Sequence, residues 1–415
     1  MNKETIKSKI EPSNTSWHFT PLDTALVDMV NSGSWLYDSY LDIDNLKESL
    51  SAVLDNYPVF AGRMTSKDSI STNNAGVYFE VAQQMQYSCK DLAATLFLPD
   101  LFKAKFDIKA FKKGNFPVMI VKVTQVSDGT LLNIAVNHVC ADGASLYRFV
   151  SDWSKIYNGQ EISPVVFNQE LFPKPQHNLK ELMEILTQKK WYKVGFKDLF
   201  LMLKDQIQSK KIVASPFFVP YTLLDDLRKK YSIDEHVGKH ALLCAYLGDL
   251  LFNKDIPENS RCSVVSVVNL RGRAIYPEGF VGNAVANIST ENIDVNAEID
   301  KTAEQINSNL RQKLEKQQLT DFFRLYTEAM TLKAPLLPFN LNGTYGKRTC
   351  LMVNDFTGFG VYDICFGENS PVMAYPNDLP DKIKMWSGNK QENGFYILLR
   401  GNLAKVFKKL YLKKN

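Results

Sequence analysis

Residues 131–159 read LLNIAVNHVCADGASLYRFVSDWSKIYNG, and the hydrophobic pattern changes within this stretch. As far as Asn137, apolar residues alternate with polar or small ones, which predicts a strand. A Ser-Asp-Gly turn signal separates this strand from an earlier apolar run at residues 118–126, so the two should form a hairpin. From Gly143 to Tyr157 apolar residues recur at the spacing of one helix face. The stretch therefore predicts a hairpin followed by a turn and a helix.

The turn before this helix carries the pattern His-x-x-x-Asp-Gly, formed by His138, Asp142 and Gly143. A junction between a strand and a helix is a good place to hold a reactive side chain, and Gly143 allows backbone angles that larger residues resist. However, a single histidine beside a strand is more often a hydrogen-bonded core residue than a catalyst. The pattern alone therefore indicates a candidate site and assigns no reaction.

Length and composition predict more than one hydrophobic core. The chain has 415 residues, 45% of them hydrophobic, which is too long for one compact core and enough for two. Strand and helix patterns are mixed in both halves, and residues 167–215 read as an irregular, basic crossover. We expect an α/β fold with two domains. The N-terminal domain comprises residues 1–195 together with residues 360–385, and the C-terminal domain comprises the rest of residues 196–415.

Periodicity predicts further elements along the chain. The expected helices are residues 23–29, 43–54, 179–186, 200–207, 223–231, 240–252, 299–314 and 403–412. The other expected strands are residues 77–81, 263–270, 350–353 and 395–400.

Charge and cysteine usage exclude several classes of function. The net charge is +4 and the basic residues are dispersed, so we expect no nucleic-acid partner. The six cysteines lack metal-ligand spacing, which predicts free thiols in a reducing compartment and no bound metal. The N-terminus lacks the apolar core of a signal peptide, and the longest apolar helix is too short to span a bilayer. We expect a monomeric, cytoplasmic protein with no membrane span.

Several short marks, in order along the chain, resemble those of one enzyme family. The chain resembles the BAHD acyltransferases, which transfer acyl groups from coenzyme A to alcohols and amines. The marks are Thr20-Pro21-Leu22-Asp23, Tyr57-Pro58 with Ala61-Gly62-Arg63, His138 to Gly143, Val268 to Arg273, and Pro277 to Val285. The resemblance implies two similar mixed-sheet domains of the chloramphenicol acetyltransferase-like type, with a channel between them for acyl-CoA and a small-molecule acceptor.

The resemblance also implies roles for individual residues. His138 would be the general base for direct attack of the acceptor on the thioester, without an acyl-enzyme, because a neutral imidazole suits this task near pH 7. Asp142 would be structural, pointing away from His138 and pairing with Arg271. Asn283 would line the channel for coenzyme A, although its neighbour Gly282 equally suits a tight turn. Acyl-CoA is then a co-substrate, and no cofactor is permanently bound.

The C-terminal family mark, DFGWG, is degenerate in this chain. Aligned without gaps, it falls on residues 365–369, where Phe366 and Gly367 survive. An alternative alignment on residues 355–360 matches more residues of the family mark but requires an insertion. The ungapped register places Asn354 and Phe356 where many members carry Thr and Trp, and of these two only the side chain of Asn354 can donate a hydrogen bond. Asn354 is therefore the candidate oxyanion donor.

Three alternatives remain beside the acyl-CoA transferase. A condensation domain, which uses a carrier-bound thioester, shares the histidine pattern but usually doubles the histidine where this chain has Asn137. A non-catalytic family member that binds a ligand or partner is suggested by Phe356, Cys365, Glu368 and Asn369. Cys140, beside His138, is a candidate nucleophile.

Overall fold

The computed structural model describes residues 2–11, 13–95, 98–209, 215–251, 261–294, 297–341, 350–375, 383–388 and 392–399. The chain divides into two compact units. Unit 1 holds residues 1–172, 276–284 and 359–379, and unit 2 holds residues 173–275, 285–358 and 380–415. These units are groups of contacts, so the expected domains with a boundary at residues 195/196 stay a prediction.

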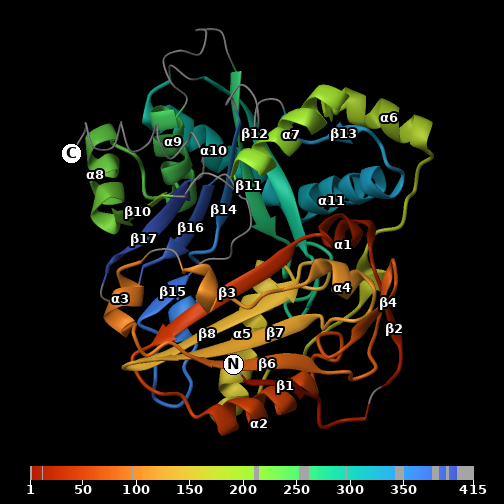
Figure 1. Ribbon diagram of the computed structural model, residues 1–415. Helices are drawn as coiled ribbons and strands as arrows, with labels where there is room; N and C mark the ends of the chain where they lie inside the picture. Colours follow the sequence, from red (N-terminus) through yellow and green to blue (C-terminus); the bar gives the residue numbers. More distant parts are fainter. Residues whose placement is uncertain are drawn as a thin grey trace. The chain divides into compact units, whose positions relative to one another are not determined.

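Unit 1 contains a mixed six-stranded sheet in the order β1-β6-β7-β8-β3-β15 (Figure 1). Its strands are β1 (Asn2–Ile6), β3 (Val30–Tyr37), β6 (Val77–Gln83), β7 (Met119–Val126), β8 (Gly129–Asn137) and β15 (Met373–Tyr375). Only β6 and β7 pair in parallel. A small sheet of β2 (Ser16–His18), β4 (Arg63–Ser66) and β5 (Ser69–Ser71) completes the strands of this unit.

The helices of unit 1 include two longer ones that contact each other, α2 (Ile43–Leu54) and α5 (Gly143–Tyr157). The buried face of α5 includes Phe149 and Trp153, and the Trp153 indole donates to the Ser49 hydroxyl of α2 at 3.0 Å. Three short helices are α1 (Pro21–Leu26), α3 (Cys89–Ala93) and α4 (Ile108–Lys112). The hairpin of β7 and β8 and helix α5 confirm the unit predicted from residues 118–159.

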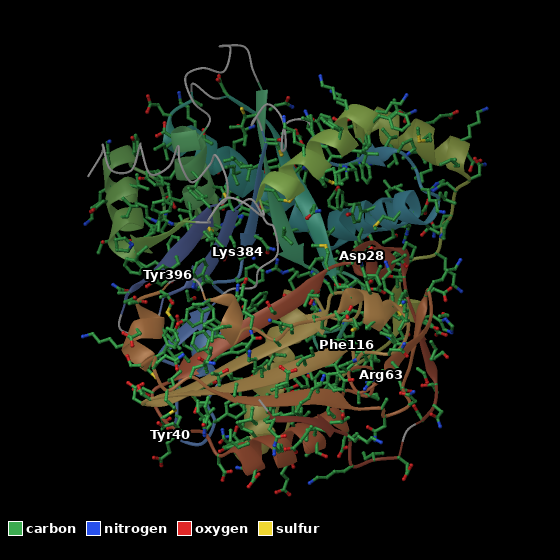
Figure 2. All side chains as sticks on the ribbon, viewed as in Figure 1. Asp28, Tyr40, Arg63, Phe116, Lys384 and Tyr396 are labelled. Atoms are coloured by element: carbon green, nitrogen blue, oxygen red, sulfur yellow. The ribbon has the colours of Figure 1, made fainter. Side chains whose placement is uncertain are left out.

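In the Ala-Gly-Arg segment, the backbone at Gly62 passes close to the backbone at Ser71. A Cβ on Gly62 would lie 2.4 Å from the Ser71 carbonyl oxygen, so a larger residue does not fit there. The Arg63 guanidinium donates to the carbonyls of Gly62, Ala75 and Gly76 at 2.8, 3.1 and 2.5 Å (Figure 2). This arginine therefore acts as a bridge between backbone segments.

The degenerate C-terminal mark packs into unit 1. Phe366 is fully buried and makes edge-on contacts with the rings of Tyr37, Trp153 and Tyr157. Gly367 has a φ of 66°, and its N–H donates to the Asn158 side chain at 2.8 Å. Of the two family residues retained in the ungapped alignment, Phe366 thus packs the loop into the core and Gly367 allows the turn.

Unit 2 contains a second mixed six-stranded sheet, in the order β10-β17-β16-β14-β11-β12. Its strands are β10 (Ser215–Pro220), β11 (Arg261–Asn269), β12 (Val285–Asp294), β14 (Cys350–Asp355), β16 (Ile383–Ser387) and β17 (Gly394–Leu399). Three helices of this unit contact the sheet or one another, α8 (Tyr221–Tyr231), α9 (Lys239–Leu251) and α10 (Ile299–Leu314). Their apolar faces and the sheet share one core.

A smaller cluster in unit 2 joins α6 (Leu179–Gln188) to α11 (Lys316–Thr331) through Leu182, Leu186 and Ala329. In the sequence, α6 is followed by β9 (Tyr192–Lys193) and α7 (Phe196–Ser209). Strand β9 pairs with β13 (Leu336–Leu337), which follows α11. The crossover region therefore contains helices at the two places where they were predicted, residues 179–186 and 200–207, and both are longer than expected.

Most predicted elements are present, with ends shifted by a few residues. The helix expected at residues 403–412 lies outside the described residues. Periodicity missed β3, β12, β16 and α11. No helix in the described part of the chain has the length and apolar character that crossing a membrane requires.

Candidate active site

His138 directly follows β8 and is 92% buried, with 8% of its surface exposed. Its backbone N–H donates to the Met29 carbonyl at 2.9 Å. The preceding residue, Asn137, is fully buried: its amide donates to the Val27 carbonyl at 3.0 Å and accepts from the Val139 N–H at 3.0 Å. These bonds fix the backbone on both sides of His138, so the ring is carried by a rigid segment.

Asn283 lies against the His138 ring. Its side-chain oxygen is 3.1 Å from Nδ1 of the imidazole. Its side-chain nitrogen donates to three oxygens: Asp23 Oδ1 at 2.8 Å, the His138 carbonyl at 2.9 Å and the Val139 carbonyl at 3.1 Å. Asn283 was expected to line the channel for coenzyme A. The structure places it beside the candidate base, and the expected role stays a prediction.

These contacts determine which imidazole nitrogen of His138 carries the proton in the neutral ring. Because the amide nitrogen of Asn283 faces three acceptors, the opposite orientation would place its oxygen against them. The side-chain oxygen therefore faces Nδ1, and Nδ1 must donate. The lone pair of the neutral imidazole is then on Nε2, which is the form a general base needs.

Asp23, the last residue of the first family mark, is almost fully buried beside Asn283. Its Oδ2 accepts from the Thr20 N–H at 2.8 Å, the Thr20 hydroxyl at 2.7 Å and the Gln169 amide at 2.9 Å. Burial raises the pKa of the Asp23 carboxyl to about 6, although the donors from Asn283, Thr20 and Gln169 lower it. The group is therefore ionised at neutral pH.

Asp142 caps α5 and also holds the segment that carries Asn283. Its Oδ1 accepts from the Ser145 N–H at 2.8 Å, and its Oδ2 accepts from the Ala284 N–H at 2.9 Å. The Ser145 hydroxyl bonds both the carbonyl and the N–H of Gly282, at 2.9 and 3.0 Å. Residues 282–284 are thus tied to the start of α5, which positions Asn283 beside His138.

Two expected site residues belong to unit 2. Arg271 follows β11, and its backbone N–H and its guanidinium both donate to the Asn269 side chain, at 3.1 and 3.0 Å. Asn354 is on β14, in register with Lys384 of β16. The pairing of Asp142 with Arg271 and the oxyanion role of Asn354 stay predictions.

Cys140 is fully buried, and its thiol donates to the Asn137 carbonyl at 3.4 Å. Burial and the negative charge of Asp23 raise the pKa of this thiol well above its ordinary value. The thiolate that a nucleophile requires is therefore disfavoured at this position. Among the residues that the structure describes, no group of three or more His, Cys, Asp or Glu side chains is placed to hold a metal ion.

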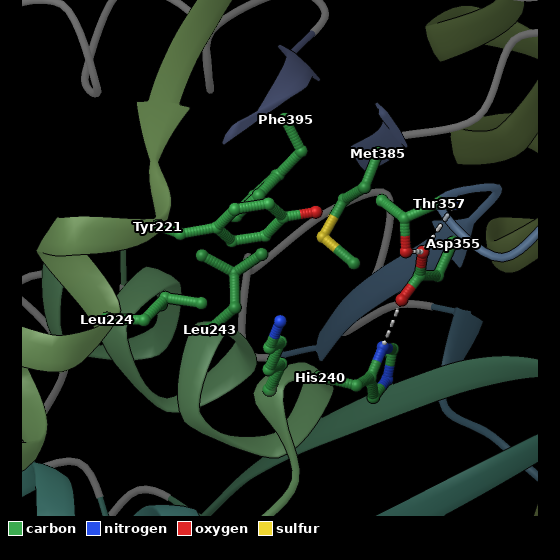
Figure 3. Close-up of a pocket in the computed structure, with 9 residues that line it drawn as sticks. Tyr221, Leu224, His240, Leu243, Asp355, Thr357, Met385 and Phe395 are labelled. Atoms are coloured by element: carbon green, nitrogen blue, oxygen red, sulfur yellow. Dashed lines mark hydrogen bonds and ion pairs between the residues drawn. The ribbon is translucent and has the colours of Figure 1, made fainter. Parts of the chain in front are cut away.

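Unit 2 has a cavity of about 50 Å³. Its lining includes the apolar side chains of Leu224, Leu243, Met385 and Phe395. Its polar lining is formed by Tyr221, Lys239, His240, Asp355 and Thr357. Figure 3 shows His240 and Asp355 facing each other at one end of the cavity, with Thr357 beside Asp355.

An ion pair closes that end of the cavity. Nδ1 of His240 lies 3.1 Å from Asp355 Oδ2, and Thr357 donates to Asp355 Oδ1 from both its N–H and its hydroxyl, at 2.9 and 2.7 Å. Burial opposes the charge on His240, but Cys244 and Asp355 raise the pKa of its imidazole well above the ordinary value. Burial likewise opposes ionisation of Asp355, but His240 and Thr357 lower the pKa of its carboxyl. Both groups are therefore charged at neutral pH.

Sequence reasoning quoted Asp23 as a family mark without a role, and it missed Gln169. The Thr-x-x-Asp spacing of residues 20–23 signals a capping box, which the start of α1 contains. That signal places the carboxylate at a helix start and says nothing of Asn283, which is 260 residues away. Only the folded chain brings these side chains together.

Comparison with known proteins gives the family. The family model described as "Transferase family" matches residues 1–399. An uncharacterized acetyltransferase of Arabidopsis thaliana, At3g50280, is 32% identical over 162 residues, which is 34% of this chain and 37% of the relative. The matched segments span 37%, 28% and 33% of the first three curated relatives, about a third of their length.

Solved structures share the fold over nearly the whole chain. Vinorine synthase has a TM-score of 0.71 at 21% identity, covering 98% of this chain and 95% of that chain. TRI101 of F. sporotrichioides, complexed with coenzyme A and T-2, has a TM-score of 0.70 at 13% identity, covering 94% and 96%. The expected fold of two mixed-sheet α/β domains is confirmed. With the family match extending over residues 1–399, the chain belongs to the Transferase family, the BAHD acyltransferases.

Proposed function

We propose that this chain transfers an acyl group from acyl-CoA to a hydroxyl or amine of a small molecule, with His138 as the general base. The observation that carries the proposal is the bond between His138 Nδ1 and the Asn283 side-chain oxygen, because it places the proton of the neutral ring on Nδ1 and the basic lone pair on Nε2. Family membership supports acyl transfer, and the similar TRI101 was solved as a complex with coenzyme A.

The proposed reaction needs no covalent intermediate on the protein. Nε2 of His138 takes the proton of the acceptor as its oxygen or nitrogen attacks the thioester carbonyl carbon. The carbonyl electrons move to oxygen and form an oxyanion, for which Asn354 is the proposed donor. When the tetrahedral intermediate collapses, the carbon–sulfur bond breaks, and the departing sulfur receives the proton from the imidazolium. The products are the acylated acceptor and free coenzyme A.

We further propose that an anionic part of coenzyme A binds at the cavity of unit 2. Lys239 and His240 supply two positive charges there against the single carboxylate of Asp355. The Lys239 ammonium lies 4.3 Å from the centre of the Tyr221 ring. Apolar side chains line the rest of the cavity. A ligand that joins phosphate groups to a less polar arm matches this lining.

A panel of acyl-CoAs and of alcohols and amines tests the proposal, with free thiol as the readout. We expect thiol release that requires both substrates, that is lost in His138→Ala, and that persists in His236→Ala. His236 is a matched control because it is a half-exposed histidine paired with Asp234 and Glu304. Release at the wild-type rate in His138→Ala would refute the assignment of the base. If no pair releases thiol while coenzyme A still binds, the chain is a ligand-binding family member.

A further inference from the structure

We propose that Asp23 is a positioning residue for His138: acting through Asn283, its carboxylate holds the imidazole in the tautomer that leaves Nε2 basic. This inference rests on the proposed function. The three side chains form a continuous series, with 2.8 Å from the Asn283 nitrogen to Asp23 Oδ1 and 3.1 Å from the Asn283 oxygen to His138 Nδ1. All three residues are buried, so water does not compete strongly for these bonds.

The Asp23 carboxylate is the only charged group among the three acceptors that face the Asn283 nitrogen. A bond from an amide to a carboxylate is stronger than one to a neutral carbonyl. It also polarises the amide, which strengthens the acceptor oxygen that faces His138. Asp23 therefore supplies the strongest of the three bonds that orient the amide, and the amide fixes the tautomer of the ring.

Asp142 has a different task, although it is closer to His138 in the sequence. Its two carboxylate oxygens accept from the N–H groups of Ser145 and Ala284, and these bonds hold backbone. The part that an aspartate plays in orienting the histidine of a catalytic triad is thus taken here by Asp23, with an amide between the two side chains.

Loss of the charge on Asp23 should weaken the hold on the Asn283 amide. Oδ2 of Asp23 faces three donors, which favours a proton or an amide nitrogen at this residue on the Oδ1 side. There it meets the Asn283 nitrogen, and two donors face each other. The carbonyls of His138 and Val139 still favour the present orientation of the amide, so the neutral ring divides between the Nδ1-protonated and the Nε2-protonated tautomer. In the Nε2-protonated form His138 cannot accept the proton of the acceptor.

A pH dependence follows from the same geometry. Because the pKa of Asp23 is raised to about 6, its carboxylate is lost as the pH falls below that value. The groups that face Asp23 are Thr20, Gln169 and Asn283, with the thiol of Cys140 as a titratable neighbour whose pKa is raised. Thr20 and Gln169 favour the charged carboxylate, so removal of either donor raises the pKa of Asp23 further.

The first test compares Asp23→Asn with Asp152→Asn as matched control. Asp152 is equally buried in unit 1 and accepts from the Tyr57 hydroxyl at 2.7 Å. We expect Asp23→Asn to lower kcat by about 10–100-fold with an unchanged KM for acyl-CoA, the usual range for a residue that orients a reactive side chain. Asp152→Asn should leave the pH profile of kcat unchanged. Wild-type kcat in Asp23→Asn would overturn the proposal.

Gln169→Leu keeps the proposal testable where Asp23→Asn does not fold. Loss of this donor should move the acid limb of the kcat profile to higher pH, because the carboxylate then accepts its proton more readily. An acid limb at the wild-type position in Gln169→Leu would contradict the assignment of that limb to Asp23.

The second test requires no activity, so it separates this inference from the proposed function. Nuclear magnetic resonance of protein with isotope-labelled histidine, with His138→Gln used to assign the signal, reports the tautomer of the neutral ring. We expect a proton on Nδ1 in the wild type and a larger share of the Nε2-protonated tautomer in Asp23→Asn. The same tautomer in both proteins would overturn the inference, whatever the assays of thiol release give. The expected change in a protein without transferase activity would overturn only the proposed function.

Discussion

The tautomer of the His138 ring is set by a residue 145 positions away in the sequence. The local pattern of strand, turn and helix places the histidine, and the backbone bonds of His138 and Asn137 hold it there. The chemistry of the ring depends on Asn283, which the contacts of Asp142 and Ser145 bring into place. The motif thus contains the candidate base, and the group that sets its tautomer lies far outside the motif.

At the residue scale, Asp142→Ala should lower the free energy of unfolding by about 2–3 kcal/mol. The change removes the cap of α5 and leaves the buried Ala284 N–H without this partner. Denaturation with urea measures the loss. The matched control is Asp107→Ala, which removes an exposed aspartate cap from the short helix α4 and should cost about 0.5–1 kcal/mol. Equal losses in both variants would contradict a second task for Asp142.

At the element scale, the loop of residues 365–369 is stabilised by one aromatic side chain. Phe366→Ala should lower the free energy of unfolding by about 3–5 kcal/mol, because Phe366 is fully buried among Tyr37, Trp153 and Tyr157. Glu368→Ala, at an exposed position of the same loop, should stay within about 0.5 kcal/mol of the wild type. A small effect of Phe366→Ala on urea denaturation would show that the alternative alignment deserves preference.

The ion pair between α9 and β14 should make stability depend on pH. The raised pKa of His240 contributes stability that is full below the ordinary histidine value and is lost as the pH rises through the folded value. The lowered pKa of Asp355 contributes stability that is full above the ordinary aspartate value and is lost as the pH falls. The contribution is therefore complete between about pH 4 and pH 6.5.

Asp355→Asn tests this pair through the melting temperature. The difference from the wild type should be largest at about pH 6 and smaller at a pH high enough for His240 to lose its charge. Asp234→Asn, which breaks the exposed pair with His236, is the control and should change little at either pH. A difference for Asp355→Asn that grows with pH would contradict the direction of the His240 shift.

The cavity beside this ion pair makes a kinetic prediction. Lys239→Gln should raise KM for acyl-CoA about tenfold with little change in kcat, because under the proposed binding mode Lys239 contacts acyl-CoA and takes no part in proton transfer. Lys230→Gln is the matched control, since the Lys230 ammonium also lies over a tyrosine ring, 4.9 Å from the centre of Tyr231, outside the cavity lining. An unchanged KM for acyl-CoA in Lys239→Gln would show that acyl-CoA binds elsewhere.

At the scale of the whole molecule, the sequence predicted the elements with clear periodicity. The hairpin before His138 and helices α2, α5 and α10 have strong alternation or helical spacing, and the structure contains them. The missed strand β3 reads VNSGSWLY, in which small polar residues hide the alternation although most of the strand is buried. Tertiary packing decides such a strand, and local pattern does not. Helix α11 differs, because Leu319, Phe323 and Tyr326 lie at helical spacing on its buried face and the local pattern was sufficient to predict it.

The candidate site shows the same limit. His138 and Asp142 were recognisable because they are close together in one motif, and the family resemblance separated their tasks. Asp23, Gln169 and Asn283 meet only because residues 276–284 pack into unit 1 while the strands on either side belong to unit 2. No spacing rule in a single sequence predicts that arrangement. The sequence therefore predicts His138 as the candidate base, but it gives Asp23, Gln169 and Asn283 no part in orienting it.

The proposed function depends above all on Nε2 of His138, which takes the proton of the acceptor during acyl transfer. The most direct test of this role is the initial rate of acceptor-dependent thiol release from acyl-CoA, measured for the wild type and for His138→Ala under saturating substrates. We predict that kcat falls by about 10²–10⁴-fold in His138→Ala while acyl-CoA binds with wild-type affinity. A His138→Ala protein that turns over at the wild-type rate would contradict this role.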